Sequence, residues 1–256
     1  MRKEPFRLLD LFSGIGGFSL GLERSEAFKT VAFCEIEPFC RRVLAKHWPK
    51  VPCYDDIRTL TAERLAADGI GVDAICGGFP CQDISVAGKG AGLAGERSGL
   101  WREYARLIGE LRPRYVIVEN VSALLSRGLD DVLGDLAALG YDTEWNCLSA
   151  GFIGLPQVRD RVWVLAYPNQ IGRETVCAIQ TGFTDQAGAF RQWEQVELCG
   201  TRSGNARYLP TSRTCRVAHG VPEGVDRIGA LGNAVVPQIP ELIGRAILQS
   251  EARHAA

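Results

Sequence analysis

The order of apolar runs along the chain constrains its fold more than any other feature of the sequence. From residue 7 to residue 166, short apolar runs alternate with segments of helical spacing. The predicted strands are 7–12, 30–35, 72–76, 115–119 and 161–166. The predicted helices between them are 18–24, 38–47, 99–111 and 129–139. Because continuous apolar runs are typical of strands buried on both faces, the alternation predicts an α/β fold with a doubly wound, mostly parallel sheet.

The amino-acid composition of the chain changes after residue 166. Residues 167–224 are rich in Gly, Gln, Thr, Ser and Arg and show no sustained apolar period, so we expect a small irregular lobe there. Farther on, one helical face carries Ile239, Leu242, Ile243, Ala246 and Ile247. We therefore predict a first domain at 1–166, a lobe at 167–224, and a C-terminal segment at 225–256 that returns to the first domain.

Composition and charge describe an ordinary globular protein, with 46% hydrophobic and 23% charged residues. The net charge of −1 means that any basic surface must be local. The nine cysteines include no Cys-x-x-Cys pair and only three histidines are present, so we expect free thiols in a reducing compartment and no metal site. Asp10 and the glycines from Gly14 interrupt the first apolar stretch. We therefore expect neither a signal peptide nor a membrane span, and a soluble, cytoplasmic protein.

A glycine turn follows the first predicted strand, in the segment Asp10-Leu11-Phe12-Ser13-Gly14-Ile15-Gly16-Gly17-Phe18. A turn between a strand and a helix offers backbone amides and a helix dipole to an anion, which predicts a cofactor cradle. Ser19 occupies the third position of a Gly-x-Gly-x-x-Gly pattern, which argues against a dehydrogenase. Glu35 ends the next strand, where an acid can bind ribose hydroxyls. A plain turn and a solvated acid are the alternative.

Cys81 lies in the loop Gly77-Gly78-Phe79-Pro80-Cys81-Gln82, directly after the predicted strand 72–76. Ligands of α/β sheets bind at the carboxyl ends of strands, which makes Cys81 a candidate nucleophile. Taken alone, a loop cysteine is more often a small buried apolar residue. The glycine-punctuated stretch 88–99 follows, with Lys89 and Arg97 in it. It predicts a loop that moves and touches phosphates, or else a passive connection.

Two further segments carry polar side chains near predicted strand ends. Glu119 follows four apolar or aromatic residues, so burial would raise its pKa and let it hold a proton near neutrality. An exposed strand-end acid is the alternative. Gln157, Arg159 and Arg161 alternate along an extended segment and so share one face. That face offers a planar hydrogen-bonding surface, unless the two arginines only pair with acids.

Together these motifs resemble the cytosine-C5 DNA methyltransferases, which methylate cytosine with S-adenosylmethionine. The resemblance runs from the glycine turn through Pro80-Cys81-Gln82 and Glu119-Asn120-Val121 to the Gln157 segment and Gly232-Asn233. Pro-Cys-Gln followed by Glu-Asn-Val is highly specific for this family. The resemblance implies a Rossmann-like methyltransferase sheet, S-adenosylmethionine as the cofactor and double-stranded DNA as the partner. The compact arrangement is similar to that of small enzymes from bacteriophages and prophages.

The resemblance also implies roles for individual residues. The cofactor pocket would be lined by Phe12, Gly14, Gly16, Gly17, Glu35, Ile36, Asp56, Ile57, Pro80 and Asn233. Glu35 would bind the ribose and Asp56 would lie near the adenine amine. The Cys81 thiolate would add to C6 of a flipped cytosine while Glu119 supplies a proton at N3. Cytosine and its neighbourhood would be anchored by Arg159, Arg161 and Gln157.

The stretch 201–217 carries arginines and no acidic residue, which makes it the expected basic patch for DNA. DNA contacts are expected from Ser85, Lys89, Arg97, Arg202, Arg207, Arg213 and Arg216. We further expect a monomer in a bacterial host cell, with a companion restriction enzyme as a possible partner.

Two alternatives stay open. The region 167–224 is short for a target-recognition domain of this family, so the protein could bind DNA and keep its cofactor pocket yet methylate poorly. Against this alternative, every catalytic position is filled. The other alternative is an RNA cytosine-C5 methyltransferase on the same scaffold. The recognisable tRNA-acting relative departs from the pattern near its nucleophile, whereas Pro80-Cys81-Gln82 does not.

Overall fold

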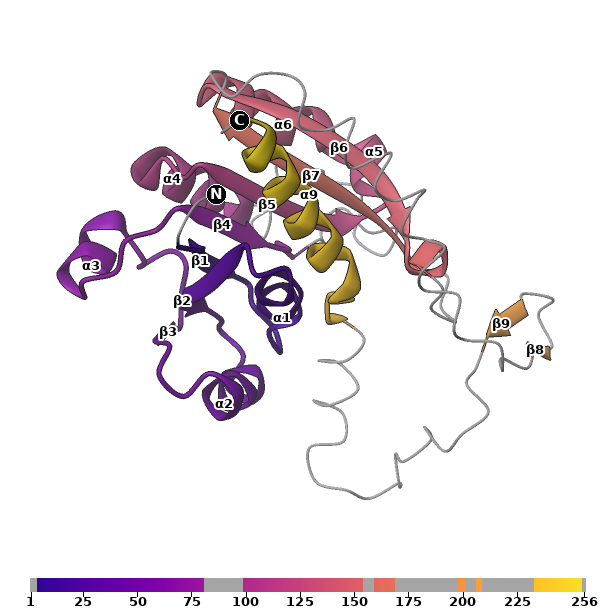
Figure 1. The fold of residues 1–256 in the computed structure, drawn as a ribbon, viewed down its shortest axis with the longest axis horizontal. Coiled ribbons are helices and arrows are strands. Elements are labelled where there is room, and N and C mark those ends of the chain that lie inside the picture. The colour runs from indigo at the N-terminus through magenta and orange to yellow at the C-terminus, as the bar shows by residue number, and fades with distance from the viewer. Residues whose placement is uncertain are drawn as a thin grey trace.

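The computed structural model describes residues 4–80, 99–153, 159–168, 198–200, 206–208 and 233–254. Its centre is a seven-stranded sheet with the strand order β3-β2-β1-β4-β5-β7-β6 (Figure 1). The strands are β1 (Phe6–Leu11), β2 (Phe28–Cys34), β3 (Cys53–Tyr54), β4 (Ala74–Gly77), β5 (Tyr115–Val121), β6 (Tyr141–Ser149) and β7 (Asp160–Pro168). Strands β1 to β5 pair in parallel, and β7 is antiparallel to both its neighbours. The prediction of an α/β fold with a mostly parallel sheet is confirmed.

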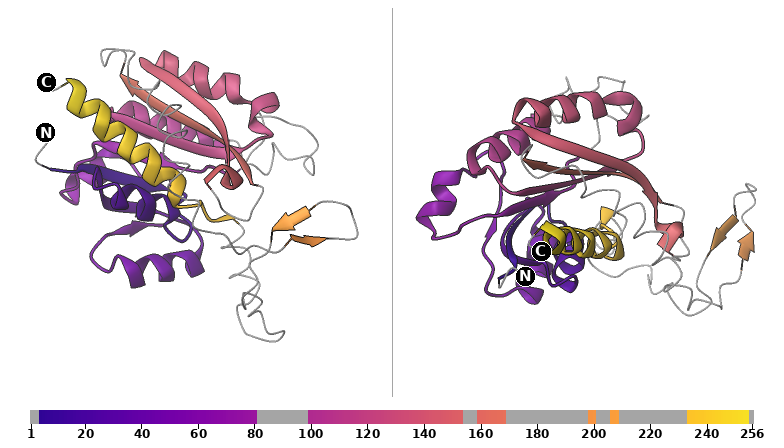
Figure 2. Two further views of the ribbon diagram at one scale, coloured as in Figure 1. Left: turned by 45° about the vertical axis from the view of Figure 1, so that its right-hand side comes forward. Right: turned by 45° about the horizontal axis from the view of Figure 1, so that its top comes forward.

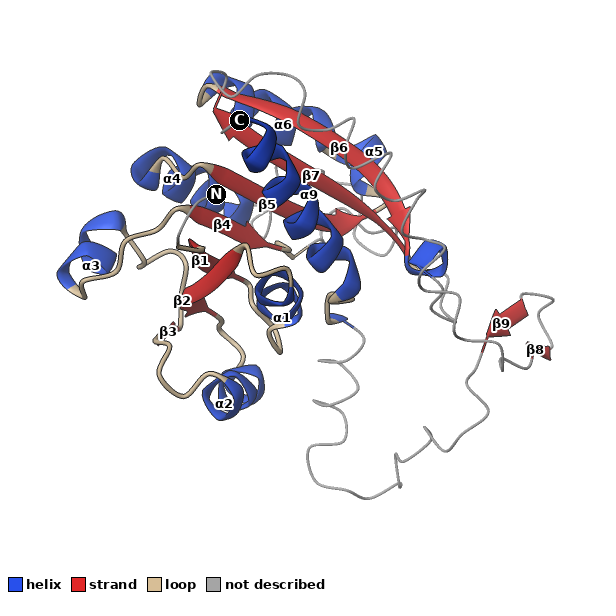
Figure 3. Cartoon of the chain, in the orientation of Figure 1, coloured by secondary structure: helices blue, strands red, loops and turns tan. Residues whose placement is uncertain are grey.

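Helices cover both faces of this sheet (Figure 3). One face packs against α1 (Gly17–Arg24) and α9 (Gln238–His254). The other face packs against α3 (Ala62–Ala67), α4 (Gly99–Leu111), α5 (Leu124–Arg127) and α6 (Leu129–Ala138). Helix α2 (Pro38–His47) links β2 to β3, and a short 3-10 helix, η2 (Ala150–Ile153), follows β6. The sheet is therefore doubly wound, as expected.

The central strands are buried on both faces, which explains their continuous apolar runs. In β1, Leu9 and Leu11 belong to the hydrophobic cluster under α4 and α6. Phe6 and Leu8 of the same strand belong to the cluster under α1 and α9. Because successive side chains of a strand point to opposite faces, a strand between two helical layers needs apolar residues at nearly every position.

Strands β6 and β7 form an antiparallel pair at one side of the sheet (Figure 3), in register from Tyr141 opposite Pro168 to Ser149 opposite Asp160. The apolar run 161–166 lies in β7, as predicted, but its direction could not be deduced from the run. Strand β6 was not predicted. It lies at the sheet edge, most of its residues are only partly buried, and Trp145 is 50% exposed, so it lacks an apolar run.

The C-terminal helix α9 lies beside α1 (Figure 2). Two glycines of α1 permit this close approach, because a Cβ built on Gly17 would lie 2.4 Å from the Val235 carbonyl oxygen. A Cβ on Gly21 would lie 2.1 Å from the Pro237 carbonyl oxygen. The N-terminal part of α1 therefore contacts the chain that enters α9.

Most of the predicted lobe at 167–224 lies outside the described residues. Within it, β8 (Leu198–Gly200) pairs with β9 (Ala206–Tyr208) in a separate antiparallel sheet. The domain boundaries at residues 166 and 224 stay predictions. In the part of the chain that the structure describes, no helix has both the length and the apolar character needed to cross a bilayer.

Candidate active site

The candidate residues gather at one edge of the sheet because of the strand directions. Strands β1, β2, β4 and β5 are mutually parallel, so their carboxyl ends meet at this edge. Strand β7 runs the opposite way, and its amino end therefore reaches the same edge, with Arg161 opposite Val121 of β5. The glycine turn, Glu35, Gly78 and Glu119 consequently lie along the same edge of the sheet as the residues that begin β7.

The glycine turn after β1 wraps the Glu35 carboxylate. Phe12, Gly14 and Gly16 all have positive φ, at 51°, 54° and 86°, a backbone conformation that favours glycine and is uncommon for Phe. The Gly14 amide donates to Glu35 Oε2 at 2.6 Å, and the Glu37 amide donates to Oε1 at 2.8 Å. Glu35 is buried. Its position is thus set by two backbone donors from different segments.

The space around the three glycines differs. No atom lies within 4 Å of a Cβ built on Gly14, among the residues that the structure describes. A Cβ on Gly16 would lie 2.7 Å from the Trp48 ring, and Gly17 abuts the Val235 carbonyl. Free space therefore lies beside Gly14, whereas Gly16 and Gly17 are glycines because protein atoms fill the space next to them. The contact of Gly14, Gly16 and Gly17 with a cofactor stays a prediction.

A second segment lies beside Glu35, at the end of β3. The Glu35 amide donates to the Tyr54 carbonyl at 2.9 Å, which brings Asp56 and Ile57 close to the Glu35 carboxylate. The pKa of the Cys34 thiol reflects this crowding of negative charge. The pKa of Cys34 is raised to about 12, chiefly by burial. Smaller contributions come from the charges of Cys53, Glu35, Asp56 and Asp55.

Side chains on this segment and next to Glu35 differ in exposure. Ile36 is 62% exposed although it is apolar, whereas Ile57 is buried. Both oxygens of Asp56 accept from the Arg58 guanidinium, at 2.7 to 3.0 Å. These hydrogen bonds lower the pKa of Asp56. The predicted adenine contact of Asp56 would therefore share the carboxylate with Arg58.

Asp10 is a buried carboxyl that the sequence did not single out as a candidate. It points toward α1, where the Ser19 hydroxyl donates to Oδ2 at 2.7 Å and the Ser19 amide donates at 3.3 Å. Burial raises the pKa of Asp10 to about 7, and the bonds from Ser19 oppose that rise. The only signal in the sequence was an acid at the end of an apolar run. Its role is to join β1 to α1 under the glycine turn.

Glu119 and Arg161 form the central ion pair of the site. Arg161 Nε lies 3.0 Å from Glu119 Oε1, and Glu119 is largely buried. Burial raises the pKa of Glu119, while the charges of Arg161 and Arg159 oppose the rise. A Cβ on Gly78 would lie 2.8 Å from Glu119 Oε2. The second carboxylate oxygen thus faces the backbone that leads to Pro80, and the predicted burial of Glu119 is confirmed.

Arg159 lies on the same side of the site and is partly buried. Its Nη2 donates to the Asn233 carbonyl at 3.3 Å, which joins the chain before β7 to the chain before α9. Burial lowers the pKa of Arg159, as does the nearby charge of Arg161. The structure therefore brings Arg159, Arg161 and Asn233 together near Glu119. Gln157, the third residue of the predicted face, lies outside the described residues.

The chain that enters the Cys81 loop is held by Asn120. Asn120 Nδ2 donates to the Phe79 carbonyl at 3.2 Å, and Asn120 Oδ1 accepts from the Val121 amide at 2.8 Å. The Asn120 side chain is almost fully buried. Sequence reasoning assigned Asn120 no role, although its place in the Glu-Asn-Val motif was a signal. Asn120 fixes the backbone just before Pro80.

Several predicted site residues cannot be placed. Those outside the described residues are Cys81, Ser85, Lys89, Arg97, Gln157, Arg202, Arg213 and Arg216. Arg207 lies in β9, opposite Cys199 of β8. Among the described residues, no group of three His, Cys, Asp or Glu side chains could hold a metal ion.

Comparison with known proteins agrees with this geometry. The family described as C-5 cytosine-specific DNA methylase matches residues 6–197. The Type II methyltransferase M2.BsuMI of Bacillus subtilis (strain 168) is 38% identical over 168 residues, which cover 62% of this chain and 41% of that protein. The Type II methyltransferase M.DsaV of Dactylococcopsis salina is 30% identical over 181 residues, covering 69% of this chain and 50% of that protein. The chain thus matches half or less of the length of these two relatives.

Solved structures are also similar. A protein described as a DNA modification methyltransferase encoded within a prophage (E. coli) is 25% identical, with a TM-score of 0.55, over 65% of this chain and 47% of that one. The Entamoeba histolytica methyltransferase EhMeth is 13% identical, with a TM-score of 0.68, over 99% of this chain and 100% of that one, and shows the fold alone. The family match, the fold and the Glu119 and Glu35 sites lead to one identification: this chain belongs to the C-5 cytosine-specific DNA methylase family.

Proposed function

We propose that this protein transfers a methyl group from S-adenosylmethionine to C5 of cytosine in double-stranded DNA. The observation that carries the proposal is the buried Glu119 carboxyl, paired with Arg161 at 3.0 Å and facing Gly78. Gly78 precedes Pro80 and Cys81 by two and three positions. A buried carboxyl whose pKa is raised by burial therefore lies beside the backbone that leads to a candidate nucleophile.

The residues present fit S-adenosylmethionine. Among the described residues, no atom fills the space next to Gly14, whose amide donates to the buried Glu35 carboxylate, and the exposed apolar side chain of Ile36 follows Glu35. A carboxylate suits the two ribose hydroxyls, and an apolar side chain suits one face of an adenine. The Gly14 amide donates to Glu35, so the cofactor's own carboxylate would be held by the amino end of α1. When bound, the cofactor supplies an electrophilic methyl group.

The chain's own residues would perform the remaining chemistry. Cytosine C5 is too weakly nucleophilic to take a methyl group unaided, so the Cys81 thiolate forms a bond to C6. Glu119 gives its proton to N3, which holds the displaced electron pair as an enamine. After C5 accepts the methyl group, the C5 proton leaves to water and the S–C6 bond breaks. The thiolate leaves, N3 returns its proton to Glu119, and the ring regains its aromaticity.

The two arginines would keep Glu119 usable in this reaction. Arg161 holds one carboxylate oxygen and so fixes the orientation of the other. Burial favours the protonated carboxyl, whereas Arg161 and Arg159 favour the charged one. These opposed effects keep both protonation states within reach, as a group that first gives and then regains a proton requires.

Delivery of the base would depend on segments that lie mostly outside the described residues, with Arg207 of β9 among the described ones. A stacked cytosine cannot be reached from both sides of its ring, so it would be flipped from the duplex. The loop 81–98 and the arginines at 202, 207, 213 and 216 would contact the DNA. Because the relatives above are Type II methyltransferases, a restriction enzyme in a bacterial cytoplasm is the proposed companion of a monomeric chain.

Covalent trapping tests the proposal. Duplex DNA that carries 5-fluorocytosine, incubated with the protein and S-adenosylmethionine, should yield a stable protein–DNA adduct, because fluorine at C5 cannot leave as a proton. The adduct should vanish with Cys81→Ser and persist with Cys147→Ser, which changes a partly buried cysteine of β6. Absence of the adduct, with cofactor and DNA both shown to bind, contradicts the proposal. The same assay on tRNA separates an RNA substrate from DNA.

A further inference from the structure

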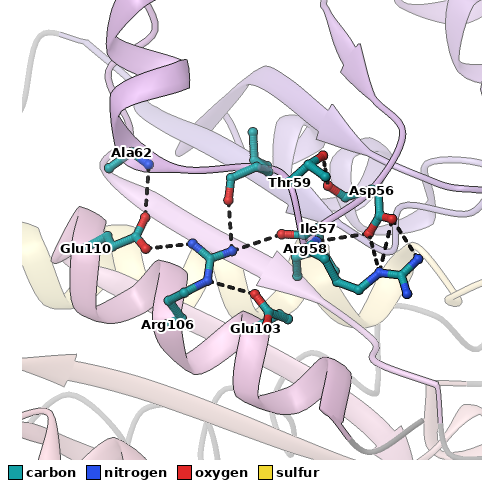
Figure 4. Close-up of polar contacts among 9 residues, drawn as sticks. Asp56, Ile57, Arg58, Thr59, Ala62, Glu103, Arg106 and Glu110 are labelled. Carbon is teal, nitrogen blue, oxygen red and sulfur yellow. Dashed lines mark hydrogen bonds and ion pairs between the residues drawn. The ribbon is translucent and has the colours of Figure 1, made fainter. Parts of the chain in front are cut away.

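Helix α4 carries a half-buried arginine, Arg106, whose guanidinium makes several contacts (Figure 4). Its Nη2 donates to the carbonyl oxygens of Ile57 at 3.0 Å and Leu60 at 2.9 Å. Its Nε donates to Glu103 at 2.7 Å and its Nη1 donates to Glu110 at 2.6 Å. The two glutamates belong to the same helix as Arg106. They therefore hold the guanidinium in place, and its remaining donors hold the backbone of residues 57–60.

The segment held by Arg106 is a compact turn. The Thr59 and Leu60 amides both donate to the Asp56 carbonyl, at 3.1 and 3.2 Å. Glu110 extends the clamp, because its other oxygen accepts from the Ala62 amide at 3.0 Å, at the start of α3 (Figure 4). Arg106 and Glu110 thus link α4 to both ends of the segment 57–62.

This turn has few other connections to the sheet. Strand β3, which precedes it, is only two residues long and pairs with β2 alone. The Arg58–Asp56 pair lies within the turn and is largely exposed, so it does not fix the turn relative to the sheet. The buried side chains of Ile57 and Leu60 add apolar contacts, which are not directional. The clamp from α4 supplies the directional contacts.

We propose that Arg106 is a positioning residue for the adenosine end of the cofactor site, because it fixes the turn that presents Asp56 and Ile57. The proposal rests on the proposed function, in which this turn borders the adenine. Arg106 acts through the backbone carbonyls that it binds.

Binding of S-adenosylhomocysteine and 5′-methylthioadenosine to purified protein, measured by calorimetry, tests this role. Arg106→Met should raise the Kd of both ligands about tenfold, since two charge-assisted hydrogen bonds to the turn are lost. Arg106→Lys keeps the charge but not the planar guanidinium. Its Kd for each ligand should therefore lie between that of wild type and that of Arg106→Met. In a methylation assay the KM for S-adenosylmethionine should rise in step, with kcat within about twofold of wild type.

A matched control separates positioning from general loss of stability. Arg112 follows α4 directly and binds the Leu139 carbonyl at 2.5 Å, away from residues 57–62. Arg112→Met should lower the midpoint of thermal unfolding without changing either Kd. In an Asp56→Ala background, Arg106→Met should raise the Kd less than threefold, because one of the two side chains that it positions is already gone.

The outcomes are distinguishable. If wild type binds neither ligand, the proposed function fails and the role of Arg106 fails with it. If wild type binds both and Arg106→Met binds equally well, only the role of Arg106 is overturned. The role of Arg106 is also overturned if Arg106→Met raises the Kd by the same factor in the Asp56→Ala background as in wild type, or if Arg112→Met raises the Kd equally. Should Arg106→Met not fold, Arg106→Lys carries the test, with faster amide exchange at Thr59 and Leu60 as the expected result.

Discussion

Asp10 and Glu119 are both buried carboxyl groups at the functional edge of the sheet, and their neighbours differ. Asp10 accepts two hydrogen bonds from Ser19, and the charge of Glu35 adds to the rise of its pKa. Glu119 is paired with a cation, Arg161. Burial raises the pKa of both, but only Glu119 has a positive charge beside it to oppose the rise. Asp10 is thus a structural acid, and Glu119 is suited to exchange a proton.

Asp10→Asn tests this distinction through the pH dependence of stability. The folded pKa of about 7 lies above the ordinary value of 3.8, so the stability that Asp10 contributes is complete below about pH 4 and is lost as the pH rises through 7. Asn mimics the neutral acid at every pH. The free energy of unfolding of the variant minus that of wild type should therefore be about 2 kcal/mol larger at pH 8 than at pH 5, because only wild type loses stability over this range.

Urea unfolding at the two pH values measures this difference. Asp130→Asn, which removes an exposed carboxylate on α6, is the control and should shift stability equally at both pH values. A pH-independent effect of Asp10→Asn would show that Asp10 is charged in the folded protein throughout this range.

At the scale of elements, the direction of β7 assembles the site. Were β7 parallel to β5, Arg161 would start the strand at the opposite edge, far from Glu119. The observed antiparallel register instead places Arg161 opposite Val121, two pairs along the strand from Glu119. The packing of α9 on α1 completes the arrangement, because it brings Asn233 to Arg159. Sequence periodicity predicted these elements but could not predict their relative directions.

The α1–α9 contact predicts opposite effects for two glycine substitutions. Gly21→Ala should destabilise the protein by about 1 to 3 kcal/mol, because its Cβ would lie 2.1 Å from the Pro237 carbonyl oxygen. Gly134→Ala, in α6, should stabilise it by about 1 kcal/mol, since the new Cβ meets no atom of the described residues within 4 Å and Ala favours a helix.

Both changes add the same methyl group within a helix, so thermal unfolding compares them directly. If Gly21→Ala unfolds at the wild-type temperature, α9 does not pack against α1 as closely as described. The Gly21 variant should also bind S-adenosylhomocysteine more weakly, since Val235 and Asn233 precede α9.

At the scale of the whole molecule, charge is distributed locally. The net charge is −1, so long-range attraction to DNA is small and affinity must come from particular cations. The arginines at 202, 207, 213 and 216 have no acidic residue among them. They are the expected phosphate and base contacts.

The salt dependence of duplex binding tests this arrangement. Each arginine that contacts a phosphate should contribute about −0.9 to the slope of log K against log salt concentration. Changing each of the four to Gln should therefore reduce the slope by about 0.9 where a phosphate is contacted. Where an arginine reads a base, its substitution should change the slope little and weaken the preference for one DNA sequence.

Arg64→Gln, on α3, is the control and should leave the slope unchanged. If none of the four substitutions changes the slope, the stretch 201–217 is excluded as the DNA contact. Fluorescence anisotropy at several salt concentrations provides the slopes.

The sequence by itself determined the central strands, the helices between them, and the motif residues that follow the strands. These features depend on burial, and burial leaves a local apolar period. Glu119 was predicted to be buried for the same reason. The family was also evident from the motifs, since Pro80-Cys81-Gln82 and Glu119-Asn120-Val121 each form one continuous segment.

Only the tertiary structure decided the direction of β7, the edge strand β6, the hold of Asn120 on Phe79, and the clamp of Arg106 on residues 57–60. It also showed why residue 17 is a glycine: the Val235 carbonyl packs against it and leaves no room for a side chain. The physical reason is common to all of these. A hydrogen bond or a close backbone contact between segments far apart in sequence needs only one suitable group on each side, so it leaves no periodic pattern along the chain.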